Sequence, residues 1–210
     1  MKLGYQTNTW GGVFGHPAGV TSVKDSYYIA NGSTEEALKD ISQAGYDGIE
    51  LFDGNLMEYK DKKADFLKLM NEHSLTLVGV YTGGNFIFPD ILEEELLKIE
   101  NVAALASEVG AEHLVIGGGA VRANGILESD YTALGNALNK VVEIARKYNL
   151  VASYHPHLGT NVQAPKQLDK LMSLTKINLC PDTAHIEAGG GDPVAVIRKY
   201  VDRIKYVHFK

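Results

Sequence analysis

Short apolar segments and amphipathic helical patterns alternate along all 210 residues of this chain. The apolar segments lack the in-and-out alternation of a half-exposed sheet, so they predict strands that are buried on both faces. We expect these strands at residues 3–7, 48–52, 75–81, 113–116, 150–154, 177–180 and 204–209. A regular alternation of strand and helix predicts a parallel sheet with right-handed crossovers, either doubly wound or closed into a barrel.

The helical segments carry their own start and stop signals. An apolar face recurs at three-to-four spacing over residues 92–109, and Gly110 stands where that helix should end. Ser33 and Glu36 form a capping box ahead of another helix, which Gly45 should end. These local signals agree with the alternation of strands and helices.

Two observations favour a barrel over a doubly wound sheet. No Gly-x-Gly-x-x-Gly follows the first strand, where a dinucleotide-binding fold has one. Polar residues also follow several different strands, not a single switch point. We therefore predict an α/β fold, a (β/α)8 TIM barrel. Residues 1–210 are expected to hold seven of its units as one C-terminally incomplete domain, with an open edge beside the seventh strand or the first.

Composition excludes several classes of protein. The formal net charge of −6 argues against a nucleic-acid partner, because such proteins usually have a basic face. A single cysteine excludes an internal disulfide and fits a reducing compartment. No signal-peptide pattern and no apolar run of membrane-spanning length is found, so we predict a cytoplasmic protein without a membrane partner. Whether copies of the chain form a homo-oligomer stays open.

The first connection, residues 8–31, is long and rich in aromatic residues. Long connections in compact domains often form lids or substrate walls, which makes Trp10 and His16 candidates for substrate binding. The alternative is a surface loop packed by its own aromatic side chains, and both interpretations stay open.

Polar residues that suit a metal ion end three consecutive strands. Asp182 and His185 follow the sixth strand, His208 ends the seventh, and His155 and His157 follow the fifth. The carboxyl ends of parallel strands converge on one face of a barrel. Asp-x-x-His alone is also typical of a helix cap beside a core histidine, but His208 favours a metal site. We predict Asp182, His185, His208 and His155 as ligands of one divalent ion.

Weaker candidates lie on the same predicted face. Substrate contacts are expected from Glu50, Tyr81, Asn85 and Arg122 and from the glycine run 117–119, and Lys210 is a candidate for contacting a leaving hydroxyl. A helix cap or ion pair is an equal alternative for Glu50, and a tight turn for the glycine run. His73 at a helix end and His113 at the opposite mouth of the barrel are interpreted as structural.

Three motifs carry a family resemblance. Residues 180–193 (CPDTAHIEAGGGDP) and 207–210 (VHFK) resemble the strand-six and strand-seven signatures of the xylose isomerase-like TIM-barrel superfamily. This superfamily includes sugar phosphate isomerases and epimerases, endonuclease IV and sugar-derived dehydratases. Within it, residues 154–163 (YHPHLGTNVQ) are most similar to the inosose dehydratases of inositol catabolism. The resemblance spans nearly the whole chain.

The resemblance implies one bound divalent metal ion. Mn²⁺ or Co²⁺ is the ion expected first, and Zn²⁺ and Mg²⁺ are the alternatives. Asp182 and His208 fall on two ligand positions of the family, with His185 beside them. His155 stands where the family has a strand-five Glu, and the strand-eight Glu would lie beyond Lys210. His157 matches the histidine that transfers a proton in the family's dehydratases.

The substitution at His155 favours one reaction class over another. Epimerases of the family use the strand-five and strand-eight carboxylates on opposite faces of one carbon, so losing one undermines that mechanism. We therefore predict a metal-dependent lyase that dehydrates a keto-inositol (inosose) or a similar polyol ketone, with His157, His155 and Lys210 as catalytic groups. A sugar isomerase or epimerase is the alternative. An endonuclease-IV-like enzyme would need histidines where Glu50 and Tyr81 stand, and a non-catalytic carbohydrate-binding barrel is the remaining rival.

Overall fold

The computed structural model describes residues 2–10, 13–14 and 26–210. Its main sheet has six strands in the order β1-β4-β5-β6-β7-β8, and every neighbouring pair is parallel. These strands are β1 (Gly4–Gln6), β4 (Gly48–Phe52), β5 (Thr76–Gly84), β6 (His113–Gly118), β7 (Val151–Tyr154) and β8 (Asn178–Leu179). The parallel sheet with helical crossovers confirms the predicted α/β class of TIM-barrel type, and it places all carboxyl strand ends on one side.

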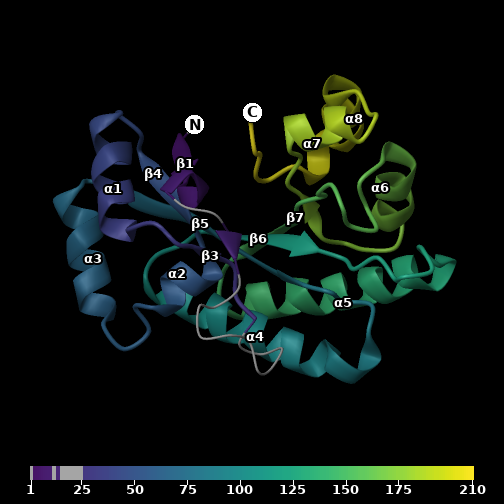
Figure 1. Cartoon of the computed structure of the whole chain (residues 1–210), viewed down its shortest axis with the longest axis horizontal. Helices are drawn as coiled ribbons and strands as arrows, with labels where there is room; N and C mark the ends of the chain where they lie inside the picture. The colour runs from purple at the N-terminus through teal and green to yellow at the C-terminus, as the bar shows by residue number, and fades with distance from the viewer. Residues whose placement is uncertain (1, 11–12, 15–25) are drawn as a thin grey trace.

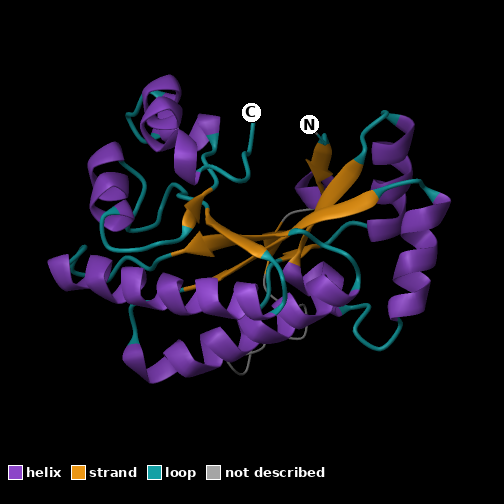
Figure 2. Ribbon diagram, turned by 180° about the vertical axis from the view of Figure 1, so that it is seen from behind, coloured by secondary structure: helices purple, strands orange, loops and turns teal. Residues whose placement is uncertain are grey.

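Helices surround this sheet. They are α1 (Thr34–Gln43), α2 (Asp53–Met57), α3 (Lys63–Glu72), α4 (Pro89–Glu108), α5 (Glu128–Lys147), α6 (Pro165–Met172), α7 (Thr183–Ala188) and α8 (Pro193–Tyr200), with a 3-10 turn η3 (Val201–Arg203) after α8. Figure 1 shows α1 and α3 at one end of the sheet, α4 and α5 along one face, and α6 to α8 at the other end. The view from behind shows the strands at the centre of these helices (Figure 2).

The predicted start and stop signals act as expected. Ser33 caps α1 by accepting a hydrogen bond from the Glu36 backbone N–H at 3.2 Å. Gly45 and Gly110 follow α1 and α4 with φ of 83° and 88°, in the left-handed region that favours glycine. The helices bury their apolar faces against the sheet, where residues such as Leu38 and Leu114 are fully buried.

The seventh predicted strand, residues 204–209, is not a regular strand. Isolated parallel bridges join Ile204 to Leu179 and His208 to Asp182, so the segment runs beside β8 without a continuous ladder. Two features shorten the ladder. Pro181 has no N–H to donate, and α7 begins two residues after it at Thr183. The segment nevertheless brings His208 to the carboxyl end of β8.

The first connection contains a 3-10 turn, η1 (Thr7–Trp10), and a short antiparallel pair of β2 (Val13–Phe14) with β3 (Ile29–Ala30). Among the described residues, no helix combines the length and the apolar character that crossing a bilayer requires.

Candidate active site

Four histidines form one cluster at the carboxyl ends of the strands. His155 follows β7, and His157 lies two residues further along the same segment. His185 lies in α7, and His208 lies in the segment beside β8. The ring centroid of His155 is 4.6 Å from that of His208. The His155 centroid is 5.6 Å from the centroids of His157 and of His185. The centroids of His157 and His185 are 3.8 Å apart.

Asp182 is fully buried beneath the cluster, with one oxygen hydrogen-bonded and the other facing cationic or titratable groups without a hydrogen bond among the described residues. Oδ1 caps α7 by accepting hydrogen bonds from the backbone N–H groups of Ala184 and His185 at 3.0 and 3.1 Å. Oδ2 lies 2.6 Å from Lys210 Nζ, and 3.7 and 3.8 Å from His185 Nε2 and His208 Nδ1. Burial favours the neutral acid, but the Lys210 ammonium and the backbone N–H of His185 together outweigh it and hold the pKa of Asp182 below its usual value.

Glu50, in the middle of β4, contacts His208 from inside the barrel. His208 Nε2 lies 3.1 Å from both carboxylate oxygens, and Gln6 Nε2 donates to Oε1 at 2.6 Å. Burial disfavours the charged imidazole, but the Glu50 carboxylate outweighs it and raises the pKa of His208. Of the two roles left open for Glu50, the ion pair is present: the buried carboxylate accepts from His208 Nε2 and orients the ring with Nδ1 toward Asp182. A substrate contact of Glu50 stays a prediction.

His157 is held in one tautomer by the backbone. Its Nδ1 lies 2.7 Å from the Leu158 carbonyl oxygen, so Nδ1 carries the hydrogen and Nε2 carries the lone pair. Thr160 Oγ1 donates to the His157 carbonyl at 2.7 Å and braces the same turn. The half-buried ring therefore presents a basic nitrogen beside the other imidazoles.

His155 is the most buried member of the cluster, with 2% of its surface exposed. Its Nδ1 has no hydrogen-bond partner among the described residues. Burial, and then the neighbouring imidazoles, lower the pKa of His155 well below its usual value. A neutral imidazole with an unpartnered buried nitrogen is costly in an apolar interior unless something binds it.

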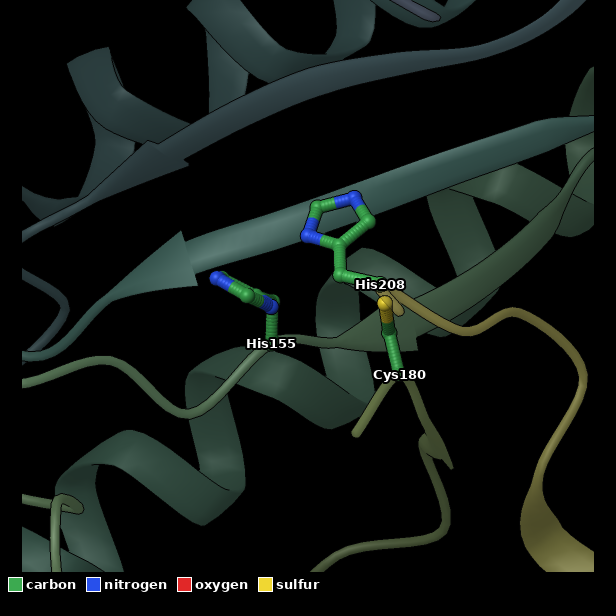
Figure 3. Close-up of side chains that lie close together, drawn as sticks. All are labelled: His155, Cys180 and His208. Atoms are coloured by element: carbon green, nitrogen blue, oxygen red, sulfur yellow. The ribbon is translucent and has the colours of Figure 1, made fainter. Parts of the chain in front are cut away.

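The donor atoms fit a divalent metal ion. Two groups have ligand atoms within 4.8 Å of one another, His155 with Cys180 and His208, and His155 with His157 and His185. Figure 3 shows the side chains of the first group close together, at the ends of β7 and β8 and on the segment beside β8. Imidazole nitrogens and a thiol sulfur are typical ligands of zinc and related ions, and the orphaned Nδ1 of His155 points to the same conclusion.

Replacing Glu50 with Gln is expected to weaken Zn²⁺ binding by about 10- to 100-fold, because a carboxylate that accepts from a ligand histidine orients the ring and increases its basicity. Competition with a chromogenic chelator measures this affinity. Glu187→Gln removes the same charge from an exposed position on α7 and should leave the affinity unchanged. Equal affinities of Glu50→Gln and the unaltered chain would contradict this role for Glu50.

A cavity of about 230 Å³ opens between the carboxyl ends of β5 and β6. Its lining includes Tyr28, Asn85, Lys98 and the glycines at 83, 84, 118 and 119. Tyr81 links this cavity to the histidines, since its ring contacts Tyr28 at 5.2 Å and His155 at 5.7 Å between centroids. Gly117 makes room for Tyr81, because a Cβ at that position would overlap the tyrosine hydroxyl.

Two other residues that were predicted to contact substrate, Trp10 and Arg122, form contacts elsewhere in the structure. Trp10 Nε1 donates to Asp40 on α1 at 3.1 Å. Arg122 forms an ion pair with Asp130 at 2.9 Å, at the start of α5. Neither is among the residues that surround the histidine cluster or line the cavity. His16 lies outside the described residues.

His73 and His113 lie at positions that agree with a structural role. His73 ends α3, and His113 begins β6, at the opposite end of that strand from the cavity. The His113 ring packs against Tyr206 with centroids 5.0 Å apart.

Cys180 and Gln6 are site residues that the sequence analysis missed. Cys180 was used as evidence on redox compartment and as the first residue of the motif at 180–193, but not as a ligand, although it directly precedes Pro181 and Asp182 at a strand end. That position was the available signal. Gln6 carries no comparable signal, because its contact with Glu50 joins two strands 44 residues apart.

Comparison with known proteins gives a consistent result. The model of the xylose isomerase-like TIM barrel family matches residues 38–210. The inosose dehydratase of Clostridium tetani is 42% identical over 86 residues, which are 40% of this chain and 29% of that protein. The inosose dehydratase of Geobacillus kaustophilus is 27% identical over 192 residues, 84% of this chain and 61% of that protein. The chain thus spans less than two thirds of the length of these relatives.

Among solved structures, the IolI protein with a bound zinc atom superposes with a TM-score of 0.74 at 16% identity, covering 100% of this chain and 72% of that one. At this identity the likeness concerns the fold alone.

Proposed function

Because the chain belongs to the xylose isomerase-like TIM barrel family, we propose that it contributes the active site of a metal-dependent lyase. The proposed substrate is a keto-inositol or a similar polyol ketone, which loses water. The relatives named inosose dehydratase support this substrate class, and the segment that carries His155 and His157 supports the reaction class.

The metal would be held by His155 and His208 from the buried side and by Asp182 and His185 from the rim. When bound, a divalent ion supplies Lewis-acid polarisation of the substrate carbonyl, which makes the adjacent C–H more acidic. Tyr81, Asn85 and the glycine-lined cavity would surround the rest of the polyol. We propose a small polyol or sugar as the only partner required for the reaction.

The observation that carries the proposal is the fixed tautomer of His157. Its Nδ1–H is hydrogen-bonded to the Leu158 carbonyl at 2.7 Å, so Nε2 is ready to accept a proton. An elimination next to a ketone begins with removal of the α-proton, and a positioned imidazole is well suited to that step near neutral pH. His155 stays neutral and cannot replace the carboxylate that a two-carboxylate epimerase needs on the second face of the carbon.

Lys210 would complete the elimination. Its ammonium lies 2.6 Å from Asp182 Oδ2, at the rim of the cluster. The C–H electrons form the new C=C bond as His157 takes the proton. The β-C–O bond breaks, and the hydroxyl leaves as water with a proton from the Lys210 ammonium. Asp182 holds that ammonium in place.

The test is turnover of an inosose by the chain loaded with Mn²⁺, Co²⁺ or Zn²⁺ in deuterated water, followed by NMR. We expect loss of one water per turnover and formation of a hydroxy-enone or the 1,2-diketone of which it is the enol. Deuterium exchange at one carbon without loss of water would instead identify an epimerase or isomerase. Absence of both from inososes and ketohexoses would overturn the proposal.

A further inference from the structure

The chain's single cysteine lies within the histidine cluster. Cys180 directly follows β8 and is fully buried. Its sulfur and one nitrogen from each of His155 and His208 lie within 4.8 Å of one another. Figure 3 shows the three side chains lying close together. The unpartnered Nδ1 of the almost fully buried His155 is an independent sign that this region holds a ligand.

The charged groups around the cluster already have partners. Both oxygens of Glu50 are hydrogen-bonded to His208, and Gln6 also donates to one of them. Asp182 caps α7 with one oxygen and pairs with the Lys210 ammonium through the other. On the buried side of the site, His155 and His208 offer only neutral imidazoles, so an anionic donor there would join Asp182 at the rim in neutralising a divalent ion.

We propose that Cys180 is a thiolate ligand of the metal ion, which makes the inner donor set two imidazole nitrogens and one sulfur. This inference rests on the metal site of the proposed function. Ligation forms a sulfur–metal bond and releases the thiol proton to water. Soft sulfur favours Zn²⁺ and Co²⁺ over Mg²⁺, which takes oxygen ligands. The proposed donor set therefore favours Zn²⁺ or Co²⁺ over Mg²⁺.

X-ray absorption at the zinc edge tests this on the zinc-loaded 210-residue chain. We expect one sulfur neighbour at about 2.3 Å beside nitrogens at about 2.0–2.1 Å. Because Cys180 is the only cysteine, a thiolate signal from the unaltered chain identifies it without any variant. Co²⁺ loading should give a thiolate-to-metal charge-transfer band, and an excess of Mg²⁺ should not displace the ion.

Cys180→Ser and Cys180→Ala provide the paired variants. Both should lose the sulfur neighbour and the charge-transfer band and bind Zn²⁺ at least tenfold more weakly, with circular dichroism checking that they fold. His73→Gln, at the end of α3, should retain all three signals.

A zinc-loaded chain with only nitrogen and oxygen neighbours would overturn the assignment of Cys180 and leave the proposed function standing. A chain that binds none of Mn²⁺, Co²⁺ and Zn²⁺ would overturn both. Thiolate ligation without inosose turnover would support Cys180 and overturn the proposed lyase.

Discussion

His157→Gln is expected to lower the turnover of inosose dehydration by about a hundredfold or more while metal content stays near that of the unaltered chain. A positioned acid-base group contributes about that much to a rate. The Gln amide can still hydrogen-bond to its surroundings, but it has no basic nitrogen to accept the α-proton. Turnover of the metal-loaded chain is measured together with metal content. Exchange of the substrate's α-proton with solvent deuterium should slow equally, since proton removal precedes the loss of water.

The matched control for this prediction is His73→Gln, which makes the same change at the end of α3. It should leave turnover and metal content unchanged. His155→Ala should instead lower metal content, because it removes a buried ligand. If the His157 variant is fully active and His155→Ala retains its metal but not its activity, the two histidines have been assigned the wrong way round. If neither substitution matters, the dehydratase proposal fails.

The features that sequence predicted well are those that depend on local patterns. Short apolar runs without in-and-out alternation predicted the parallel strands, because each strand must be buried between its neighbours and the outer helices. Ser33 and Gly45 predicted the ends of α1 for the same local reason. The clustering of His155 with His208 follows from the same logic, since adjacent parallel strands end on the same face.

The features that sequence could not predict depend on contacts between distant residues. Glu50 and His208 are 158 positions apart, and no local pattern distinguishes a carboxylate that orients a histidine from one that binds substrate. The segment 204–209 has the composition of a strand, yet Pro181 and the early start of α7 reduce its pairing with β8 to isolated bridges. The donor role proposed for Cys180 needs three-dimensional distances for the same reason.

Asp53 and Lys98 form another contact between residues that are distant in the sequence, a buried ion pair beside the cavity. Asp53 is fully buried at the start of α2, and Lys98 on α4 is 3% exposed, with Nζ 3.8 Å from Asp53 Oδ2. The ammonium also donates to the carbonyl oxygens of Ser26 and Gly83 at 3.0 and 2.6 Å. Burial raises the pKa of Asp53 and lowers that of Lys98, although each charge opposes the shift of the other. Lys98 therefore ties the first connection to the end of β5.

Lys98→Met is expected to lower the free energy of unfolding by about 3–5 kcal/mol, because it leaves the Asp53 carboxylate buried without its counter-ion. Urea unfolding at neutral pH measures this as a lower midpoint. Lys140→Met, an exposed position on α5, is the matched control and should change stability by less than about 0.5 kcal/mol. The deficit should shrink as pH falls toward about 4, the ordinary pKa of an aspartic acid.

The sign of this pH effect follows from the raised pKa of Asp53. In the acid range the folded variant binds a proton that the unfolded chain does not yet hold, so folding becomes more favourable as pH falls through that window. Adding Asp53→Asn to Lys98→Met removes the buried charge at every pH, and the double variant should recover part of the lost stability and lose the pH dependence. A Lys98→Met deficit that is the same at pH 4 and pH 7 would show that the lost hydrogen bonds to Ser26 and Gly83, and not the uncompensated carboxylate, are what the substitution removes.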